Sequence, residues 1–340
     1  MKSCRLLQTF LLVLTMSFAL QSHAWTRSHA VTFATLPPGT AHPEGITADG
    51  QGNIYVADFD VSKSSGPGNV VMFDAAGKLL HKFDITGSSP LLLGIAFRPQ
   101  TNDLLVIDFG NRNVLKLDPV SGAVTVFAAI PGAAGPNALT FDASGNVYIS
   151  DSFQATIWRT PPTGGNPVAW VVDPLLGTDG VPPFGANGLA FNKAQSALFV
   201  ANTGEDTVVR IRVAGGQPDT AEVFVNSISG ADGLLIDDAD NIWVVANQAD
   251  EIVVLNPTGR VIAKLGDFDG IDAHGSPIGL LFPASLVISN GFLYVTNLSL
   301  DLRVFQLPQT VDSQWAAEVT RHTIARIRAQ LPPVRGLSSP

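Results

Sequence analysis

The sequence predicts an all-β protein: a six-bladed β-propeller whose ring is closed by an N-terminal strand and followed by a short C-terminal helix. Three observations predict this fold. A module recurs six times along the 340 residues, each copy holds about four short alternating segments separated by Gly, Asp or Asn, and the last copy stops before its outer strand. Four antiparallel strands per copy, repeated around a ring, are typical of a propeller.

The first segment of the chain does not resemble the module. Lys2 and Arg5 precede the apolar run LLQTFLLVLTMSFAL, and QSHA then supplies small residues before Trp25. This order is typical of a secretory signal peptide, so we expect residues 1–24 to be removed and the mature protein to be secreted or periplasmic. No other stretch approaches the roughly 20 apolar residues of a membrane span, so no membrane contact is expected after cleavage.

The strand-like segment AVTFATL (30–36) follows, and then the six copies of the module. The copies run over residues 43–85, 92–129, 136–173, 186–226, 231–268 and 283–306. Because the last copy lacks an outer strand, we expect AVTFATL to pair with it and to close the ring. A ring closed by both chain ends leaves no free sheet edge, so we expect one propeller domain over residues 25–311.

The tail, residues 312–340, differs in pattern from the module. A pair of prolines at 332–333 would stop a helix. Ahead of them, larger side chains recur every four residues, at Trp315, Val319, Thr323 and Ile327. This spacing predicts a short helix docked on the propeller, with a loose end after it.

Charge and cysteine content exclude several classes of function. Without Lys2 and Arg5 the 20 basic residues fall to 18 against 29 acidic ones, so the formal net charge changes from −9 to −11. An acidic protein of this kind is not expected to bind nucleic acid or anionic membranes. The only cysteine, Cys4, lies in the signal segment, so no disulfide or thiol chemistry is expected. We expect a monomer that binds a small molecule.

One position of the module carries residues suited to chemistry. The innermost strand of each copy begins with a variable residue, which a small residue follows. The small residues suit strands that crowd around an axis, and they are Gly45, Gly94, Ala138, Gly188, Gly233 and Ser285. The variable residues are Glu44, Leu93, Asn137, Asn187, Asp232 and Ala284.

Equivalent positions of a closed ring lie at equal height around the axis. Four oxygen-bearing side chains, the quartet, should therefore meet at one mouth of the channel: Glu44, Asn137, Asn187 and Asp232. Two carboxylates and two amide carbonyls suit a hard divalent cation, calcium above all, with another divalent cation left open. Without a cation, one carboxylate would have to bind a proton, or water would have to separate the two. Leu93 and Ala284 cannot ligate and leave one side of the ring apolar or open to substrate.

The six copies, the strands of the NIYVAD type and the order Glu, Asn, Asn, Asp resemble the senescence marker protein/gluconolactonase family, over roughly residues 30–310. The chain is similar, more distantly, to paraoxonases and diisopropyl fluorophosphatase, and it shares its strand pattern with NHL-type propellers. The resemblance implies a six-bladed propeller with a catalytic calcium ion at the channel mouth. It also implies that Glu44, Asn137, Asn187 and Asp232 are the metal ligands.

The resemblance supplies a reaction class. It implies an exported calcium-dependent hydrolase that acts on a lactone or ester, or on a phosphotriester, with Asp232 as general base or nucleophile. His274, in the long loop 266–283, is a second catalytic candidate, and His42 lies two residues before Glu44. Two further long loops, 58–69 and 173–186, are expected on the face of the quartet, where they would shape substrate access.

Two alternatives remain open. One is a non-enzymatic NHL-like propeller that binds a glycan, peptide or protein partner; the other is a metal-free propeller of the strictosidine-synthase type. A set of Asp and Asn residues at the ends of the second strands is expected to make local turn hydrogen bonds rather than a second site: Asp58, Asp108, Asp151, Asn202, Asn247 and Asn297.

Overall fold

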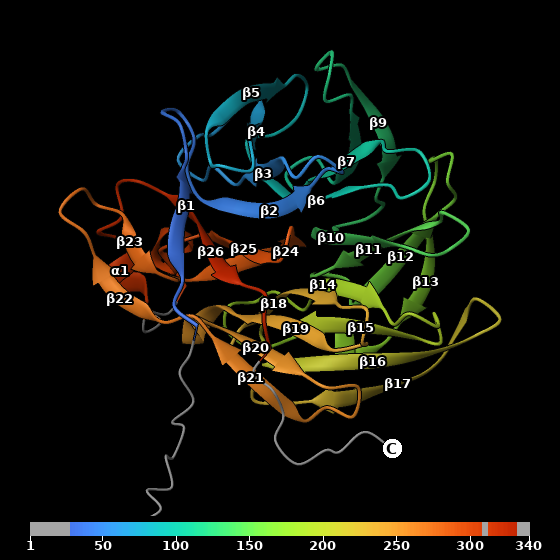
Figure 1. Cartoon of the computed structure of the whole chain (residues 1–340). Helices are drawn as coiled ribbons and strands as arrows, with labels where there is room; N and C mark the ends of the chain where they lie inside the picture. The colour runs from blue at the N-terminus through green and yellow to red at the C-terminus, as the bar shows by residue number, and fades with distance from the viewer. Residues whose placement is uncertain (1–27, 308–311, 332–340) are drawn as a thin grey trace, which may run out of the picture.

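The computed structural model describes residues 28–307 and 312–331, which form six four-stranded antiparallel sheets arranged as blades around a central channel. In Figure 1 the blades follow one another around the ring, from blue at the top through green and yellow to orange and red. The all-β fold, the six blades and the ring closure predicted from the sequence are confirmed. The predicted signal peptide, residues 1–24, lies outside the described residues.

Each of the first three blades is a run of four consecutive strands, from the channel to the rim. Blade 1 holds β2 (Pro43–Ala48), β3 (Ile54–Asp58), β4 (Gly68–Phe73) and β5 (Leu79–Ile85). Blade 2 holds β6 (Leu92–Phe97), β7 (Leu104–Asp108), β8 (Asn113–Leu117) and β9 (Val124–Ala129). Blade 3 holds β10 (Pro136–Phe141), β11 (Val147–Asp151), β12 (Thr156–Thr160) and β13 (Val168–Val172).

Blades 4 and 5 repeat this plan. Blade 4 holds β14 (Ala186–Phe191), β15 (Ala197–Asn202), β16 (Thr207–Ala214) and β17 (Gln217–Val225), and the short 3₁₀ helix η1 (Pro174–Leu176) precedes it. Blade 5 holds β18 (Ala231–Ile236), β19 (Ile242–Ala246), β20 (Glu251–Leu255) and β21 (Val261–Leu265), with η2 (Asn247–Ala249) between β19 and β20. A hairpin of β22 (Phe268–Ile271) and β23 (Pro277–Gly279) follows at the edge of the ring.

Blade 6 is assembled from both ends of the chain. Its order from the channel outward is β24 (Pro283–Ser289), β25 (Phe292–Asn297), β26 (Thr323–Arg328) and β1 (Val31–Thr35). The N-terminal strand is therefore the outermost one, as predicted, and in Figure 1 blue β1 lies beside red β26. Between β25 and β26 the described chain forms η3 (Leu302–Phe305) and α1 (Ser313–Ala316).

The predicted boundary of the propeller at residue 311 is wrong, because the tail supplies a strand of blade 6. Only Ser313–Ala316 is α-helical, and Thr323 and Ile327, which the four-residue spacing placed on the helix, lie in β26. The physical reason is that β25 needs a partner on its outer side, and β26 pairs with it over five residues. Ile324 and Ile327 are fully or almost fully buried in this pairing.

Short hairpin turns join strands within the blades, and the same pattern of hydrogen bonds recurs in them. In the β2–β3 turn, Asp49 Oδ1 accepts hydrogen bonds from the backbone N–H groups of Gln51 and Asn53, and Gly52 takes a φ of 84°. The β4–β5 turn repeats this with Asp74 and Gly77. An Asp that bonds the backbone two residues on, followed by a residue that tolerates positive φ, fixes the turn and so the register of both strands.

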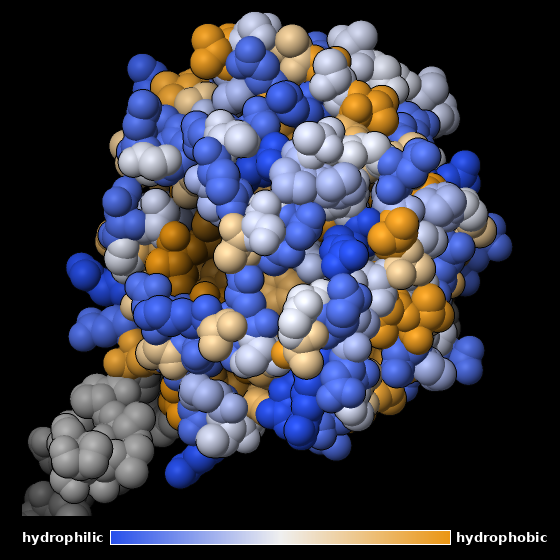
Figure 2. Space-filling view, turned by 90° about the vertical axis from the view of Figure 1, so that its right-hand side faces the viewer, coloured by the Kyte–Doolittle hydropathy of each residue, from blue (hydrophilic) through white to orange (hydrophobic). Residues whose placement is uncertain are grey.

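The hydrophobic core is divided among the contacts between neighbouring blades. For example, Tyr55 and Val70 of blade 1 pack in one cluster with Ile95 and Val106 of blade 2. Burial of such side chains contributes roughly 1.5–3 kcal/mol each and holds the ring together. The rim of the ring in Figure 2 is mostly polar, with scattered hydrophobic residues and one hollow with a hydrophobic floor. Within the described part of the chain, no helix has the length and apolar character to cross a membrane.

Candidate metal centre in the channel

The small residues of the inner strands let neighbouring blades approach closely. A Cβ atom added at Gly45 would lie 2.2 Å from the carbonyl oxygen of Leu93, and one at Gly188 would lie 2.5 Å from that of Asp232. Backbone oxygens cannot yield to such contacts, so a larger residue would force the inner strands apart. The carbonyls in question belong to the variable position, so the glycines set how closely its side chains gather around the axis.

The structure places the four quartet residues at the start of four inner strands, β2, β10, β14 and β18. All are buried, with 4% exposure for Glu44, 5% for Asn137, 4% for Asn187 and 5% for Asp232. Glu44, Asn137 and Asn187 line one cavity of about 450 Å³ inside the channel, which all six inner strands enclose. Glu44 and Asp232 lie close enough for the charge of Asp232 to act on the pKa of Glu44.

Burial disfavours the ionised forms of the two carboxyl groups, Glu44 and Asp232. Burial raises the pKa of Asp232 to about 7, although the nearby amides of Asn247 and Asn187 and the Gly233 backbone oppose this rise. Burial also raises the pKa of Glu44 well above its usual value, and the charge of Asp232 raises it further. Glu44 Oε2 and Asp232 Oδ1 are buried and have no hydrogen-bond partner. Each of these two oxygen atoms can therefore take up a proton or bind a cation.

Three residues that the sequence interpretation did not assign to the site hold the quartet side chains. The Asn137 amide donates to Ser152 Oγ at 3.4 Å, and the Asn187 amide donates to Thr203 Oγ1 at 3.0 Å. The Asn247 amide donates to Asp232 Oδ2 at 2.9 Å. All three partners lie directly after the second strand of their blade.

Asn247 is an exception to the structural role predicted for the ends of the second strands. Strand register pairs Ala231 with Ala246, whereas the equivalent pair in blade 4 is Ala186 with Asn202. Asn247 therefore lies one position beyond Asn202 and reaches the site. An alignment of the blades by the middle of their second strands, rather than by their Asn residues, would have shown this offset of one residue.

The other members of that set that are described below also bond the backbone, but these bonds reach the loop before the inner strand and are distinct from the local turn bonds that we expected. Asp58 accepts from the backbone N–H of Ala41, and Asp151 accepts from that of Gly135. Asn202 donates to two backbone carbonyls of the preceding loop. Asn297 accepts from Leu281 N–H and is 1% exposed, so the Asn-Leu-Ser glycosylation sequence at this position is not accessible in the folded protein.

On the side of the loops, the ring is covered by apolar side chains. Leu93 and Ala284, the apolar members of the variable position, belong to one buried cluster with Phe59 and Phe282. The same cluster includes three leucines of the segment after β25, namely Leu298, Leu300 and Leu302. Three of the quartet residues, Glu44, Asn137 and Asn187, line the channel cavity, and none of the residues that line it comes from the three long loops.

The structure places His274 in a hairpin at the edge of the ring, and no contact with the quartet supports the catalytic role predicted for it. His274 is exposed at the turn of the β22–β23 hairpin, outside the ring, where its backbone N–H donates to Asp272. Within loop 266–283, Phe268 of this hairpin contacts Trp315 of α1, with 5.7 Å between the ring centres. His42 packs against His322 at 4.4 Å between ring centres, and burial lowers the pKa of both.

The donor set of the quartet suits a hard divalent cation. Over residues 28–307 and 312–331, no three His, Cys, Asp or Glu side chains gather to hold a metal. The quartet differs from such a cluster because two of its members are amides, which offer neutral carbonyl oxygens. Calcium binds carboxylate and amide oxygens of this kind. The unpartnered oxygens of Glu44 and Asp232 show that the residues present fit such an ion.

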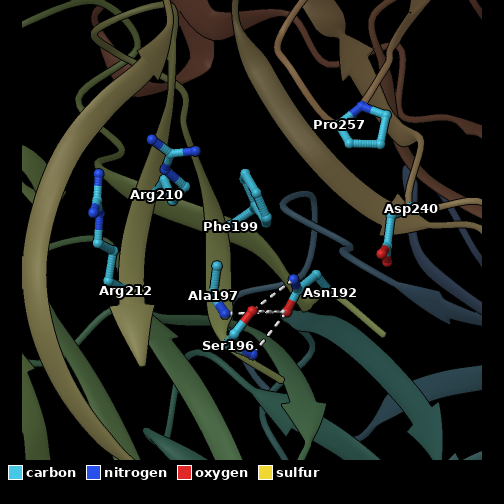
Figure 3. Close-up of a pocket in the computed structure, with 8 residues that line it drawn as sticks. All are labelled: Asn192, Ser196, Ala197, Phe199, Arg210, Arg212, Asp240 and Pro257. Carbon is cyan, nitrogen blue, oxygen red and sulfur yellow. Dashed lines mark hydrogen bonds between the residues drawn. The ribbon is translucent and has the colours of Figure 1, made fainter. Parts of the chain in front are cut away.

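A second hollow lies on the rim between blades 4 and 5 and has a volume of about 340 Å³ (Figure 3). Arg210 and Arg212 line it, and both donate to Glu222 Oε1. Asn192 turns its carbonyl oxygen to the backbone N–H groups of Ser196 and Ala197. These polar groups already have hydrogen-bond partners within the chain. The hollow therefore offers fewer unpartnered polar groups to a ligand than the channel does.

Comparison with known proteins agrees with this geometry. Residues 181–266 match the family model of the SMP-30/gluconolactonase/LRE-like region, so the resemblance predicted from the sequence is confirmed there. This stretch contains two quartet residues, Asn187 and Asp232. A search of the curated proteins finds no match to the chain.

Several solved structures share the fold. A gluconolactonase from Xanthomonas campestris has a TM-score of 0.61 at 14% identity, over 90% of this chain and 99% of that one. The calcium-binding protein regucalcin from Agrobacterium tumefaciens has a TM-score of 0.59 at 15% identity, over 91% and 100%. A streptogramin B lyase has a TM-score of 0.55 at 15% identity, over 81% and 83%. A gluconolactonase, a lyase and a calcium-binding protein thus share this architecture, so the reaction must be argued from the site.

Proposed function

We propose that this chain, which shares its fold and the match over residues 181–266 with SMP-30/gluconolactonase/LRE-like proteins, is an exported hydrolase that depends on calcium or another divalent cation. Its substrate would be a small lactone or ester, or a phosphotriester. The observation that carries the proposal is the pair of buried, electrostatically interacting carboxyl groups of Glu44 and Asp232, each of which has an unpartnered oxygen.

Glu44, Asn137, Asn187 and Asp232 would hold the cation. When bound, the cation supplies Lewis acidity, which polarises a carbonyl or phosphoryl oxygen and stabilises the negative charge that forms on it. The protein contributes a dry, rigid site, since all four side chains are at least 95% buried. In such surroundings electrostatic interactions are stronger than in water.

Asp232 is the candidate general base or nucleophile. Asn247 holds Oδ2 at 2.9 Å, which fixes the carboxyl group, while Oδ1 has no partner. One carboxylate oxygen would bind the cation, and the other would accept a proton from water or attack the substrate. In the metal-free protein burial raises the pKa of Asp232 to about 7. A bound cation would favour the ionised form, which is the form that acts as a base or nucleophile. Glu44 has no such fixing partner and would serve mainly as a ligand.

The channel cavity of about 450 Å³ gives the substrate a place beside the quartet. This volume lies within the range typical of small-molecule sites, roughly 300–1,000 Å³. The acidic composition argues against nucleic-acid partners, and we propose that the mature protein acts as a monomer.

The test is substitution of the candidate base. Asp232→Asn should reduce hydrolysis of a lactone and aryl-ester panel by at least about 100-fold, because general acid–base catalysis contributes about 10²–10⁴-fold. Its matched control is Asp238→Asn, the same change at an exposed residue just beyond β18. Thermal melting of both variants checks that the fold is intact. Wild-type turnover in a folded Asp232→Asn protein would remove Asp232 from the mechanism.

A second candidate function is a binding propeller without catalysis. It is favoured by one observation: Leu298, Leu300 and Leu302 form one buried apolar cluster with Leu93 and Ala284, the apolar members of the variable position. On this hypothesis the cation would stabilise the ring, and partners would bind elsewhere on the loop face. Calcium binding together with no turnover across the lactone, ester and phosphotriester panel would favour this function over the hydrolase.

A further inference from the structure

The backbone position directly after the second strand is equivalent in five blades. In each, its N–H donates to the carbonyl of the residue before the inner strand; Ser152 donates to Gly135, Thr203 to Gly185 and Asn247 to Gly230. Phe59 and Phe109 make the same bond, to His42 and Leu91. The backbone therefore does not require a polar side chain at this position.

Side chains at this position differ between the blades. Blades 3, 4 and 5, which carry Asn137, Asn187 and Asp232, have the polar residues Ser152, Thr203 and Asn247. Blades 1 and 2 have Phe59 and Phe109, and in blade 6 the equivalent backbone bond is made one residue later, by Ser299, whose hydroxyl donates to the carbonyl of Leu281. Ser152, Thr203 and Asn247 each bond a quartet side chain, which points to a role in the site.

The hydrogen bonds define that role. Ser152 Oγ donates to the carbonyl of Ala186 at 2.8 Å, and Thr203 Oγ1 donates to that of Ala231 at 2.8 Å. Each hydroxyl has thus used its own proton and can only accept from the amide of Asn137 or Asn187. The amide nitrogen is therefore drawn to the hydroxyl, and the carbonyl oxygen on the other side of the planar amide is left for a ligand.

We propose that Ser152, Thr203 and Asn247 are positioning residues for the cation, a role that rests on the proposed function. They make Asn137 and Asn187 present oxygen instead of nitrogen, and they fix one oxygen of Asp232 so that the other is free. Ser152, Thr203 and Asn247 are 3%, 1% and 2% exposed, so water does not substitute for their hydrogen bonds. Outer partners of metal ligands commonly contribute 10–100-fold to metal affinity.

Calcium binding to the mature, chelator-treated protein, measured by titration calorimetry, tests this without reference to activity. Thr203→Val and Ser152→Ala should each raise the dissociation constant about 10–100-fold. Thr203→Ser, which keeps the hydroxyl, should restore binding to within about 3-fold of wild type. Ser150→Ala is the matched control, because Ser150 is as deeply buried in the same blade but its hydroxyl bonds only the backbone of Ala138.

The outcomes separate the two proposals. If wild type takes up no calcium at millimolar concentration, the proposed function fails and this inference with it. If wild type binds and Thr203→Val binds equally well, only the positioning role is overturned. If Ser150→Ala weakens binding as much as Ser152→Ala, the effect is a general loss of packing and the positioning role is likewise overturned. Melting temperatures in chelator identify any variant that is simply unfolded.

Discussion

At the residue scale, the channel is governed by two carboxyl groups that the fold keeps out of water. Glu44 and Asp232 come from blades 1 and 5, and neither has a basic partner at the site; the groups near them are amides and backbone. A buried carboxylate without a cation tends to take up a proton, because ionisation in such surroundings costs solvation energy. The metal-free protein should therefore depend on pH in a direction unlike that of most proteins.

The pKa of Asp232 gives the sign of this pH dependence. Its pKa rises from 3.8 to about 7 on folding, so the folded state binds the proton more tightly than the unfolded state. The stability contributed by the protonated group is complete below about pH 4 and is lost as the pH rises towards 7. We expect metal-free wild type to lose about 2 kcal/mol more between pH 5 and pH 8 than Asp232→Asn does, in urea unfolding with chelator.

Buried carboxyls outside the site do not obscure this comparison, whereas Glu44 is part of it, because the charge of Asp232 raises the pKa of Glu44. Burial raises the pKa of Asp58 and of Asp250 to about 8, but both residues are present in wild type and variant alike. Their contribution cancels in the difference between the two proteins. Parallel profiles of unfolding free energy against pH for wild type and Asp232→Asn would contradict the raised pKa of Asp232.

At the element scale, β26 decides how the ring is closed. It lies between β25 and β1 and pairs with both. Its residues Ile324 and Ile327 join clusters on its two faces, one with Phe33 and Tyr294 and one with Trp243. The last blade therefore depends on a segment that returns from α1, and removal of its buried side chains should weaken the whole ring.

The prediction at this scale is a large loss of stability when one buried isoleucine of β26 is shortened. Ile324 is fully buried, so Ile324→Ala should lower the free energy of unfolding by about 2–5 kcal/mol. Val31→Ala in the adjacent strand β1 is the control, since Val31 is 52% exposed and should change stability by less than about 1 kcal/mol. Equal effects in urea unfolding would argue that the tail is only docked on the ring and not part of the sheet.

At the scale of the whole molecule, a cation on the axis would link blades that are distant in the sequence. Its four ligands come from blades 1, 3, 4 and 5, so binding requires the closed ring. The unfolded chain does not hold these four residues together, and a ligand that binds only the folded state stabilises it by mass action.

We therefore expect calcium at about 100 times its dissociation constant to add about 2.7 kcal/mol to the stability of the mature protein. This corresponds to a rise of roughly 4–8 °C in melting temperature for a domain of this size, and excess chelator should reverse it. Magnesium and manganese, tested in parallel, report the preference of the site. An unchanged melting temperature with all three cations would contradict the metal site.

The sequence alone determined the architecture and the quartet, because both depend on repetition. A module written six times must form six similar blades, and residues at one position of the module must lie at one height around the axis. Glu44, Asn137, Asn187 and Asp232 could be found in this way without coordinates, and so could the closing strand at residues 30–36. Local hairpin chemistry, with Asp and Gly at fixed positions, then set the register that the repeat requires.

Only the tertiary structure decided what departs from the repeat. The spacing of four at Thr323 and Ile327 fits a helix and a strand equally, because four is also a multiple of the strand period of two; the free side of β25 settled it. The one-residue offset that brings Asn247 to Asp232 is a matter of register, and the position of His274 depends on how its hairpin folds away from the ring. Such features arise from contacts between segments far apart in the sequence, which a local pattern cannot specify.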